Sequence, residues 1–86
     1  MTMTGMVEGI VQDKHGGKQI GAEVEILGTD LIAVTDMDGS YRIEEVPSGE
    51  QQIKASMVIG SQTKTVNVPA SGTVTVDFTL NPLKPK

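Results

Sequence analysis

The segment from residue 73 to residue 80 constrains the fold most, because its apolar and polar residues alternate without a break. Its apolar positions are Val74, Val76, Phe78 and Leu80, and its polar positions are Thr73, Thr75, Asp77 and Thr79. A period of two places the apolar side chains on one face of a β-strand, whereas a helix repeats its apolar stripe about every 3.6 residues. The segment is therefore predicted to be a strand with one buried face.

Short segments of the same kind recur along the chain, and each ends at a turn rich in Gly, Pro, Asp or Ser. The chain holds 10 Gly and 4 Pro, as expected for many short strands joined by tight turns. Residues 36–39 are predicted to form a hairpin turn in which Gly39 takes a left-handed conformation. We predict seven strands, over residues 6–12, 20–27, 31–35, 40–45, 51–58, 62–68 and 73–80.

A chain of 86 residues is long enough for one small domain. A single sheet would leave its apolar face in water, so two sheets are expected to pack face to face. We predict an all-β fold, a seven-stranded antiparallel Greek-key β-sandwich over residues 5–80, with a disordered N-terminus (1–4) and a Pro/Lys tail or linker (81–86). The predicted structural core consists of Val7, Val11, Val24, Ile26, Tyr41, Ile43, Ile53, Val66, Val68, Val74, Val76, Phe78 and Leu80.

Composition and charge exclude several functions. Lys and Arg number 7 against 11 Asp and Glu, a net charge of -4, and the aromatics are one Tyr and one Phe. Such a chain lacks the basic surface and the stacking rings that bind nucleic acid. It has no Cys, which excludes disulfides, thiol nucleophiles and zinc–thiolate sites. No apolar run approaches the roughly 20 residues of a membrane helix, and the first residues lack the features of a signal peptide.

Five motifs then occur in a characteristic order. They are Gly-Ile-Val-Gln-Asp at 9–13, Ile-Gly-Ala-Glu-Val-Glu-Ile at 20–26, Gly-Thr at 28–29, Thr-Asp-Met-Asp-Gly-Ser-Tyr-Arg-Ile at 35–43, and Val-Pro-Ser-Gly at 46–49. Together they resemble the carboxypeptidase regulatory-like domain, a transthyretin-like β-sandwich. The resemblance covers roughly residues 5–80. It implies a seven-stranded module without catalytic chemistry or cofactors, which spaces, packs or binds within a larger host protein.

The residues that could carry chemistry each have a simpler explanation. His15 lies in a Gly-rich turn without a predicted nucleophile or orienting partner beside it, and catalysis requires both. Asp36 and Asp38 with Gly39 resemble half of a calcium loop, but the favoured interpretation is an Asp that caps the tight turn through its own backbone. Three further carboxylates, Glu44, Glu45 and Glu50, are expected to lie in solvent around a turn. We therefore predict no catalytic residue, no cofactor site and no metal site, with Asp36 and Asp38 as the only calcium candidates.

The polar faces offer two further hypotheses. Thr63, Thr65, Thr73, Thr75 and Thr79 are expected to be exposed, either as ordinary outer-face residues or as a flat contact surface for a neighbouring domain. Lys54 and Lys64 are expected to point away from the core. The first and last strands are expected to be open edges that permit strand addition.

The favoured function is a non-catalytic spacer or adaptor module of a bacterial extracellular or cell-surface protein. It would contact neighbouring domains or another protein, and would be a monomer in isolation, with self-association through edge strands as a possibility. One alternative is a subunit or tip-decoration domain of a virion or contractile secretion assembly. A second is a weak ligand- or carbohydrate-binding module, disfavoured because aromatic platforms for sugars are scarce.

Overall fold

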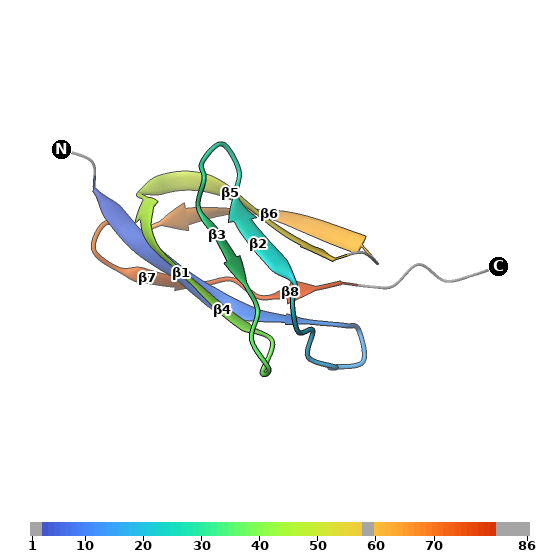
Figure 1. Cartoon of the computed structure of the whole chain (residues 1–86). Coiled ribbons are helices and arrows are strands. Elements are labelled where there is room, and N and C mark those ends of the chain that lie inside the picture. Colours follow the sequence, from blue (N-terminus) through green and yellow to red (C-terminus); the bar gives the residue numbers. More distant parts are fainter. Residues whose placement is uncertain (1–2, 58–59, 81–86) are drawn as a thin grey trace.

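The computed structural model describes residues 3–57 and 60–80, which form two β-sheets packed face to face (Figure 1). One sheet has the strand order β4-β1-β7, with β8 also pairing with β1, and the other has the order β3-β2-β5-β6. The predicted all-β sandwich is therefore confirmed. The strands are β1 (Thr4–Gln12), β2 (Glu23–Ile26), β3 (Ile32–Val34), β4 (Ser40–Pro47), β5 (Gly49–Met57), β6 (Gly60–Val68), β7 (Thr73–Thr75) and β8 (Phe78–Thr79). In this described part of the chain, no helix is long and apolar enough to cross a membrane.

The first sheet begins slightly earlier than predicted. The carbonyl of Met3 accepts the N–H of Ser48 at 2.9 Å, and the carbonyl of Thr4 accepts the N–H of Ser71 at 2.7 Å. These bonds place Thr4 in the sandwich rather than in a disordered N-terminus. Residues 1–2, the predicted tail at 81–86 and residues 58–59 lie outside the described residues.

The segment that contains β7 and β8, residues 73–80, is called the last strand below. It runs parallel to β1, which corrects the prediction of an entirely antiparallel fold. Residues 6–8 pair with β7, and residues 11–12 pair with β8, in parallel in both cases. β6 belongs to the other sheet, so the chain crosses between the layers before β7 instead of turning back in a hairpin. As a consequence β1 lies inside its sheet, and the prediction that the first strand is an open edge is wrong.

The predicted strand over residues 73–80 is also interrupted, at Val76 and Asp77. There the Oδ1 atom of Asp77 accepts the backbone N–H of Ile10 at 3.0 Å. A side-chain oxygen thus takes the place that a backbone carbonyl would have in a continuous ladder. The inward side chains stay in phase across the break, so the alternation predicts their burial but not the interruption.

β4 carries a bulge that the sequence pattern does not reveal. Its register against β1 shifts between Gly5 and Val7, where residues 44–45 stand opposite one residue of β1. Glu45 takes a positive φ of 58° at this point. The extra residue moves the inward face by one position. Val46, predicted to lie in a turn, is therefore fully buried.

The turn at residues 36–39 is tight, but it does not form the predicted hairpin. The N–H of Gly39 donates to the carbonyl of Asp36 at 2.9 Å, and the N–H of Asp36 donates to the carbonyl of Ser40 at 3.0 Å. Gly39 has a φ of 72°, as predicted for this position. The strands on either side, β3 and β4, lie in different sheets. The turn therefore carries the chain from one layer to the other.

The core lies between the two sheets and is almost entirely aliphatic. Val66 and Val74 are partly buried and pack against it. Burying one aliphatic side chain contributes about 1.5–3 kcal/mol to folding. Of the predicted set, the structure buries Val7, Val11, Val24, Ile26, Tyr41, Ile43, Ile53, Val68, Val76, Phe78 and Leu80, and it also buries Ala22, Val46 and Ala55.

Candidate functional site

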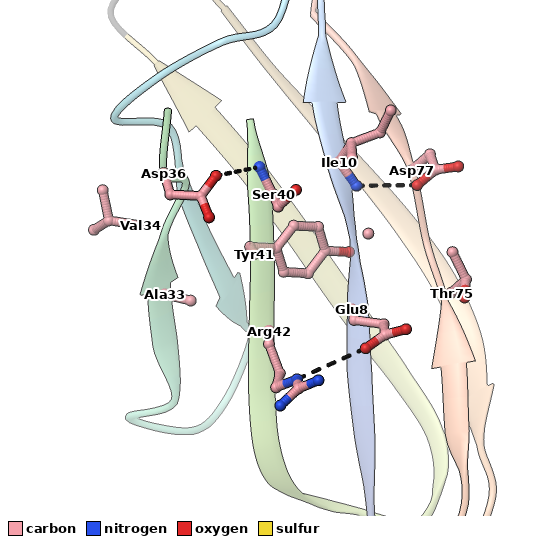
Figure 2. Close-up of a pocket in the computed structure, with 11 residues that line it drawn as sticks. Glu8, Ile10, Ala33, Val34, Asp36, Ser40, Tyr41, Arg42, Thr75 and Asp77 are labelled. Atoms are coloured by element: carbon pink, nitrogen blue, oxygen red, sulfur yellow. Dashed lines mark hydrogen bonds and ion pairs between the residues drawn. The ribbon is translucent and has the colours of Figure 1, made fainter. Parts of the chain in front are cut away.

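A groove of about 630 Å³ lies on the β4-β1-β7 sheet and is bounded on one side by β3 (Figure 2). Its volume falls within the rough range of 300–1,000 Å³ that is common for ligand pockets. The chemistry that the groove offers depends on whether its polar groups are free or already hydrogen-bonded within the protein. The lining residues are Glu8, Gly9, Ile10, Ala33, Val34, Asp36, Ser40, Tyr41, Arg42, Thr75 and Asp77.

Tyr41 is part of this lining, and its hydroxyl is already engaged. The hydroxyl donates to the carbonyl of Val76 at 2.5 Å, and the ring centre lies 6.2 Å from that of Phe78. Burial raises the pKa of Tyr41 well above its ordinary value, and the nearby carboxylate of Asp77 adds to this rise. The phenol therefore stays protonated and supports the backbone rather than exchanging protons with a substrate.

Asp77 is occupied in the same way. Figure 2 shows its carboxylate turned toward β1, where it accepts the N–H of Ile10. The neighbouring Gly9 allows this close approach, because a Cβ atom at residue 9 would lie 1.9 Å from the carbonyl oxygen of Val76. The residues at this end of the groove hold the last strand against β1.

Two side chains of β6 cover the outer edge of the last strand. The Nζ atom of Lys64 donates to the carbonyl of Asp77 at 2.5 Å. The Oε1 atom of Gln62 accepts the N–H of Thr79 at 3.1 Å. Both backbone groups would otherwise be available to an added strand. Side chains of β6 therefore cover this edge at residues 77 and 79.

The orientation of Lys64 differs from the prediction that it points away from the core. It stands opposite Ile53 in the register of β5 and β6, so it shares the face of a buried residue. Its Nζ atom lies 5.5 Å from the centre of the Phe78 ring, within the range of a cation–π contact. An inward charge of this kind discourages pairing at an edge strand such as β6.

The two calcium candidates lie in the turn between β3 and β4. The Oδ1 atom of Asp36 accepts the N–H of Asp38 at 2.9 Å and the N–H of Ser40 at 3.0 Å. Both distances describe a carboxylate that caps its own turn. Across the described ranges, no group of three His, Cys, Asp or Glu residues is placed to hold a metal ion.

His15 lies in an exposed turn that Asp13 organises. The Oδ1 atom of Asp13 accepts the N–H of Gly17 at 2.8 Å and the N–H of His15 at 2.9 Å. These bonds, that from Gly17 first, hold the pKa of Asp13 below its usual value. The polar group at this turn thus shapes the loop, and the imidazole itself is exposed.

The three carboxylates around the turn after β4 are also exposed. Glu44, Glu45 and Glu50 lie in solvent. Arg42 and Glu8 form an ion pair in the groove, with 3.7 Å between Nε and Oε1 (Figure 2). The side chain of Arg42 is 60% exposed and that of Glu8 is 41% exposed, and a pair at the surface contributes only about 0–1 kcal/mol.

The five predicted threonines are all exposed, but they do not form one surface. Thr63 and Thr65 lie on β6, Thr73 and Thr75 on β7, and Thr79 on β8. β6 belongs to a different sheet from β7 and β8. The structure therefore does not bring them together as a flat contact surface.

The most apolar part of the surface formed by the described residues was not predicted from the sequence. It lies on and beside β3, where Ile32 is 53% exposed, Val34 60%, Ile20 60% and Met37 82%. The run Leu-Ile-Ala-Val at 31–34 is apolar on both faces. Its alternation therefore could not tell which residues face outward. Only the pairing of β3 with β2 settles this point.

The fold is that of a small β-sandwich module whose described polar side chains largely hold its own backbone. The family model for the carboxypeptidase regulatory-like domain matches residues 6–81, and the chain belongs to this family. Among curated proteins, none matches the chain.

Solved structures share this fold. A chain of a type II cohesin–X-dockerin complex from Acetivibrio cellulolyticus is 25% identical, with a TM-score of 0.71 over 83% of this chain and 51% of that one. The minor pilin of Streptococcus agalactiae is 19% identical, with a TM-score of 0.73 over 100% of this chain and 48% of the pilin. The TIE protein of Bacillus anthracis is 15% identical, with a TM-score of 0.78 over 94% of this chain and 17% of that protein. The chain thus spans about half of the cohesin–dockerin chain and of the pilin.

Proposed function

We propose that this chain is a non-catalytic structural and interaction module, a spacer or adaptor, of a bacterial extracellular or cell-surface protein. The observation that carries the proposal is that polar side chains in the groove are hydrogen-bonded to the protein's own backbone. Tyr41, Asp36 and Asp77 all bind backbone atoms of the chain itself. A hydrolytic or lyase site needs a nucleophile and a base that are free to meet a substrate.

The comparisons support the same class of function. The family is a regulatory-like domain, and the similar chains include a member of a cohesin–dockerin complex and a minor pilin. Each of these chains is longer than the present one, which supports a role as one module among several. Carbohydrate binding is the weaker alternative, because the single Tyr and the single Phe are both buried and offer no exposed ring to a sugar.

The proposal is tested on intact cells of the bacterium that produces the protein. An antibody raised against the purified chain should label the cells without permeabilisation. Labelling that requires permeabilisation would contradict the extracellular location. Light scattering on the purified chain separates the two structural roles, since a spacer stays monomeric as its concentration rises and an assembly subunit self-associates.

A further inference from the structure

β3 forms an edge of the second sheet, and the backbone groups on its outer side face away from β2. Val24 stands opposite Ala33, the N–H of Ile26 donates to the carbonyl of Leu31, and the N–H of Thr35 donates to the carbonyl of Ala22. In an antiparallel pair, residues alternate between facing the partner and facing away. Positions 31, 33 and 35 therefore face β2, and the N–H and C=O groups of positions 32 and 34 point outward.

The outer edge of the last strand and the outer edge of β3 differ in how their backbone groups are covered. The outer edge of the last strand is covered at residues 77 and 79 by Lys64 and Gln62 of β6. At β3, in contrast, Ile32 and Val34 expose more than half of their surface. Among the described residues, no hydrogen bond takes up their outward backbone groups. An aliphatic edge without Lys, Pro or an inward charge is suited to strand addition.

The charges around β3 indicate what would be added. Glu25 stands opposite Ile32 and Glu23 opposite Val34, so each aliphatic side chain has a carboxylate beside it on the same face. Asp30 and Asp36 are exposed at the two ends of the strand. Four acids thus lie around Ile32 and Val34, and one basic residue, Lys54, stands opposite Glu25 on β5. This net acidic environment is complementary to an aliphatic strand with basic ends.

We propose that β3 is a docking edge for an extended segment of a partner protein, with alternating aliphatic residues flanked by Lys or Arg. The segment would add to the second sheet beside Ile32 and Val34, with its basic ends near Asp30 and Asp36. The proposal deepens the interaction role proposed above and rests on it.

A second copy of this chain fits the edge less well. Two β3 strands that pair antiparallel with Ile32 opposite Val34 would place Asp30 of one copy opposite Asp36 of the other. Like charges directly opposite each other destabilise a strand pair. Each copy also carries a net charge of -4, which opposes association at low salt.

The test uses the whole chain and a synthetic peptide, Lys-Val-Thr-Val-Lys, capped at both ends. Binding is followed by NMR through the backbone amides. We expect shifts centred on Ile32 and Val34, binding weakened by salt, and little binding of the peptide Glu-Val-Thr-Val-Glu. Two N-methylated peptides are compared, one methylated at the odd-numbered amides and one at the even-numbered amides. Only one of these two sets of N–H groups faces β3, so one peptide should lose binding and the other should keep it.

Three double variants locate the site. The double variant Ile32→Thr, Val34→Thr keeps β-branched residues but should weaken binding at least tenfold, whereas Thr63→Ala, Thr65→Ala on β6 should leave it unchanged. The double variant Glu23→Gln, Asp30→Asn should weaken binding about threefold to tenfold and reduce its salt dependence. Circular dichroism confirms that each variant is folded.

The outcomes separate this inference from the broader proposal. Absence of peptide binding, or equal binding of the two N-methylated peptides, overturns the docking edge. Surface labelling of cells would still support the extracellular module in that case. Concentration-dependent dimers that the Ile32→Thr, Val34→Thr variant abolishes would show that a second copy occupies the edge, and would overturn the assignment of a basic partner. Cells that are labelled only after permeabilisation would contradict the extracellular module without touching the peptide result.

Discussion

Gly9 of β1 and Val76 of the last strand lie closer together than any side chain at position 9 would permit. A Cβ atom there would stand 1.9 Å from the carbonyl oxygen of Val76 and 2.9 Å from the Oδ1 atom of Asp77. The missing side chain lets the last strand approach β1. There the carbonyl of Val76 accepts a hydrogen bond from the hydroxyl of Tyr41. One glycine thus enables the contacts that join β4, β1 and the last strand.

The substitution Gly9→Ala should therefore destabilise the protein by about 1–3 kcal/mol, the usual cost of forcing an extra methyl group into a packed site. Urea denaturation measures the loss. Gly28→Ala is the control, because its Cβ would meet nothing within 4 Å and only its φ of 83° opposes the change. If Gly9→Ala proved as stable as the unsubstituted protein, the close approach of the two strands would be wrong.

Tyr41→Phe should lower the free energy of unfolding by about 1–3 kcal/mol at neutral pH, because the carbonyl of Val76 loses its donor inside the protein. Urea midpoints of the two proteins at pH 7 give the difference. Equal midpoints would show that the hydroxyl contributes nothing.

The same residue predicts a loss of stability in alkali. The folded pKa of Tyr41 is raised above the ordinary value of 10.0, so above about pH 10 the unfolded chain releases a proton that the folded protein keeps. Stability should be complete below pH 10 and fall as the pH rises through the folded pKa. Tyr41→Phe should show a shallower fall, and identical pH profiles for the two proteins would contradict the burial of the phenol.

The alternation at residues 73–80 predicts which side chains are buried, because burial depends on the face of the strand and the face follows from the period of two. Strand direction leaves no trace in that period, so the parallel pairing of the last strand with β1 could not be foreseen. The burial of Val46 depends on one extra residue near Glu45, and no glycine marks that bulge.

The candidate site was harder to predict than the fold. Asp36 could be assigned to a turn, because Asp before a Gly-containing turn has a local role. Lys64 could not be assigned to the inner face, because its place depends on pairing with β5. The exposure of Ile32 and Val34 depends in the same way on which edge of the sheet remains without a neighbour.

Removal of the side chains that cover the last strand should both destabilise the protein and promote self-association. In the double variant Gln62→Ala, Lys64→Ala, the carbonyl of Asp77 and the N–H of Thr79 lose their partners. We expect a loss of about 0.5–1.5 kcal/mol in urea, because both groups are exposed and water can replace the lost partners, and larger species in light scattering. Thr63→Ala, Thr65→Ala is the matched control on the same strand. A stable monomeric double variant would show that the cover is dispensable.

Asp36→Ala should cost about 0.5–2 kcal/mol, by analogy with the loss of a capping side chain, whereas Asp36→Asn should cost less because its amide oxygen can accept the same two N–H groups. Thermal unfolding with and without calcium checks the competing interpretation. We expect calcium to leave the midpoint unchanged. A rise of several degrees that Asp36→Ala abolishes would instead establish a cation site at this turn.

Side chains of β6 cover the last strand at residues 77 and 79, whereas the outer edge of β3 lies open. Amide hydrogen exchange, measured residue by residue by NMR on the monomer, distinguishes these two edges. The amides of Ile10 and Thr79, held by Asp77 and Gln62, should exchange slowly, as should that of Ala33, which faces β2. The amides of Ile32 and Val34 should exchange at rates close to those of an unstructured peptide. Protection of these two amides equal to that of Ala33 would show that the edge is already occupied and would contradict the account.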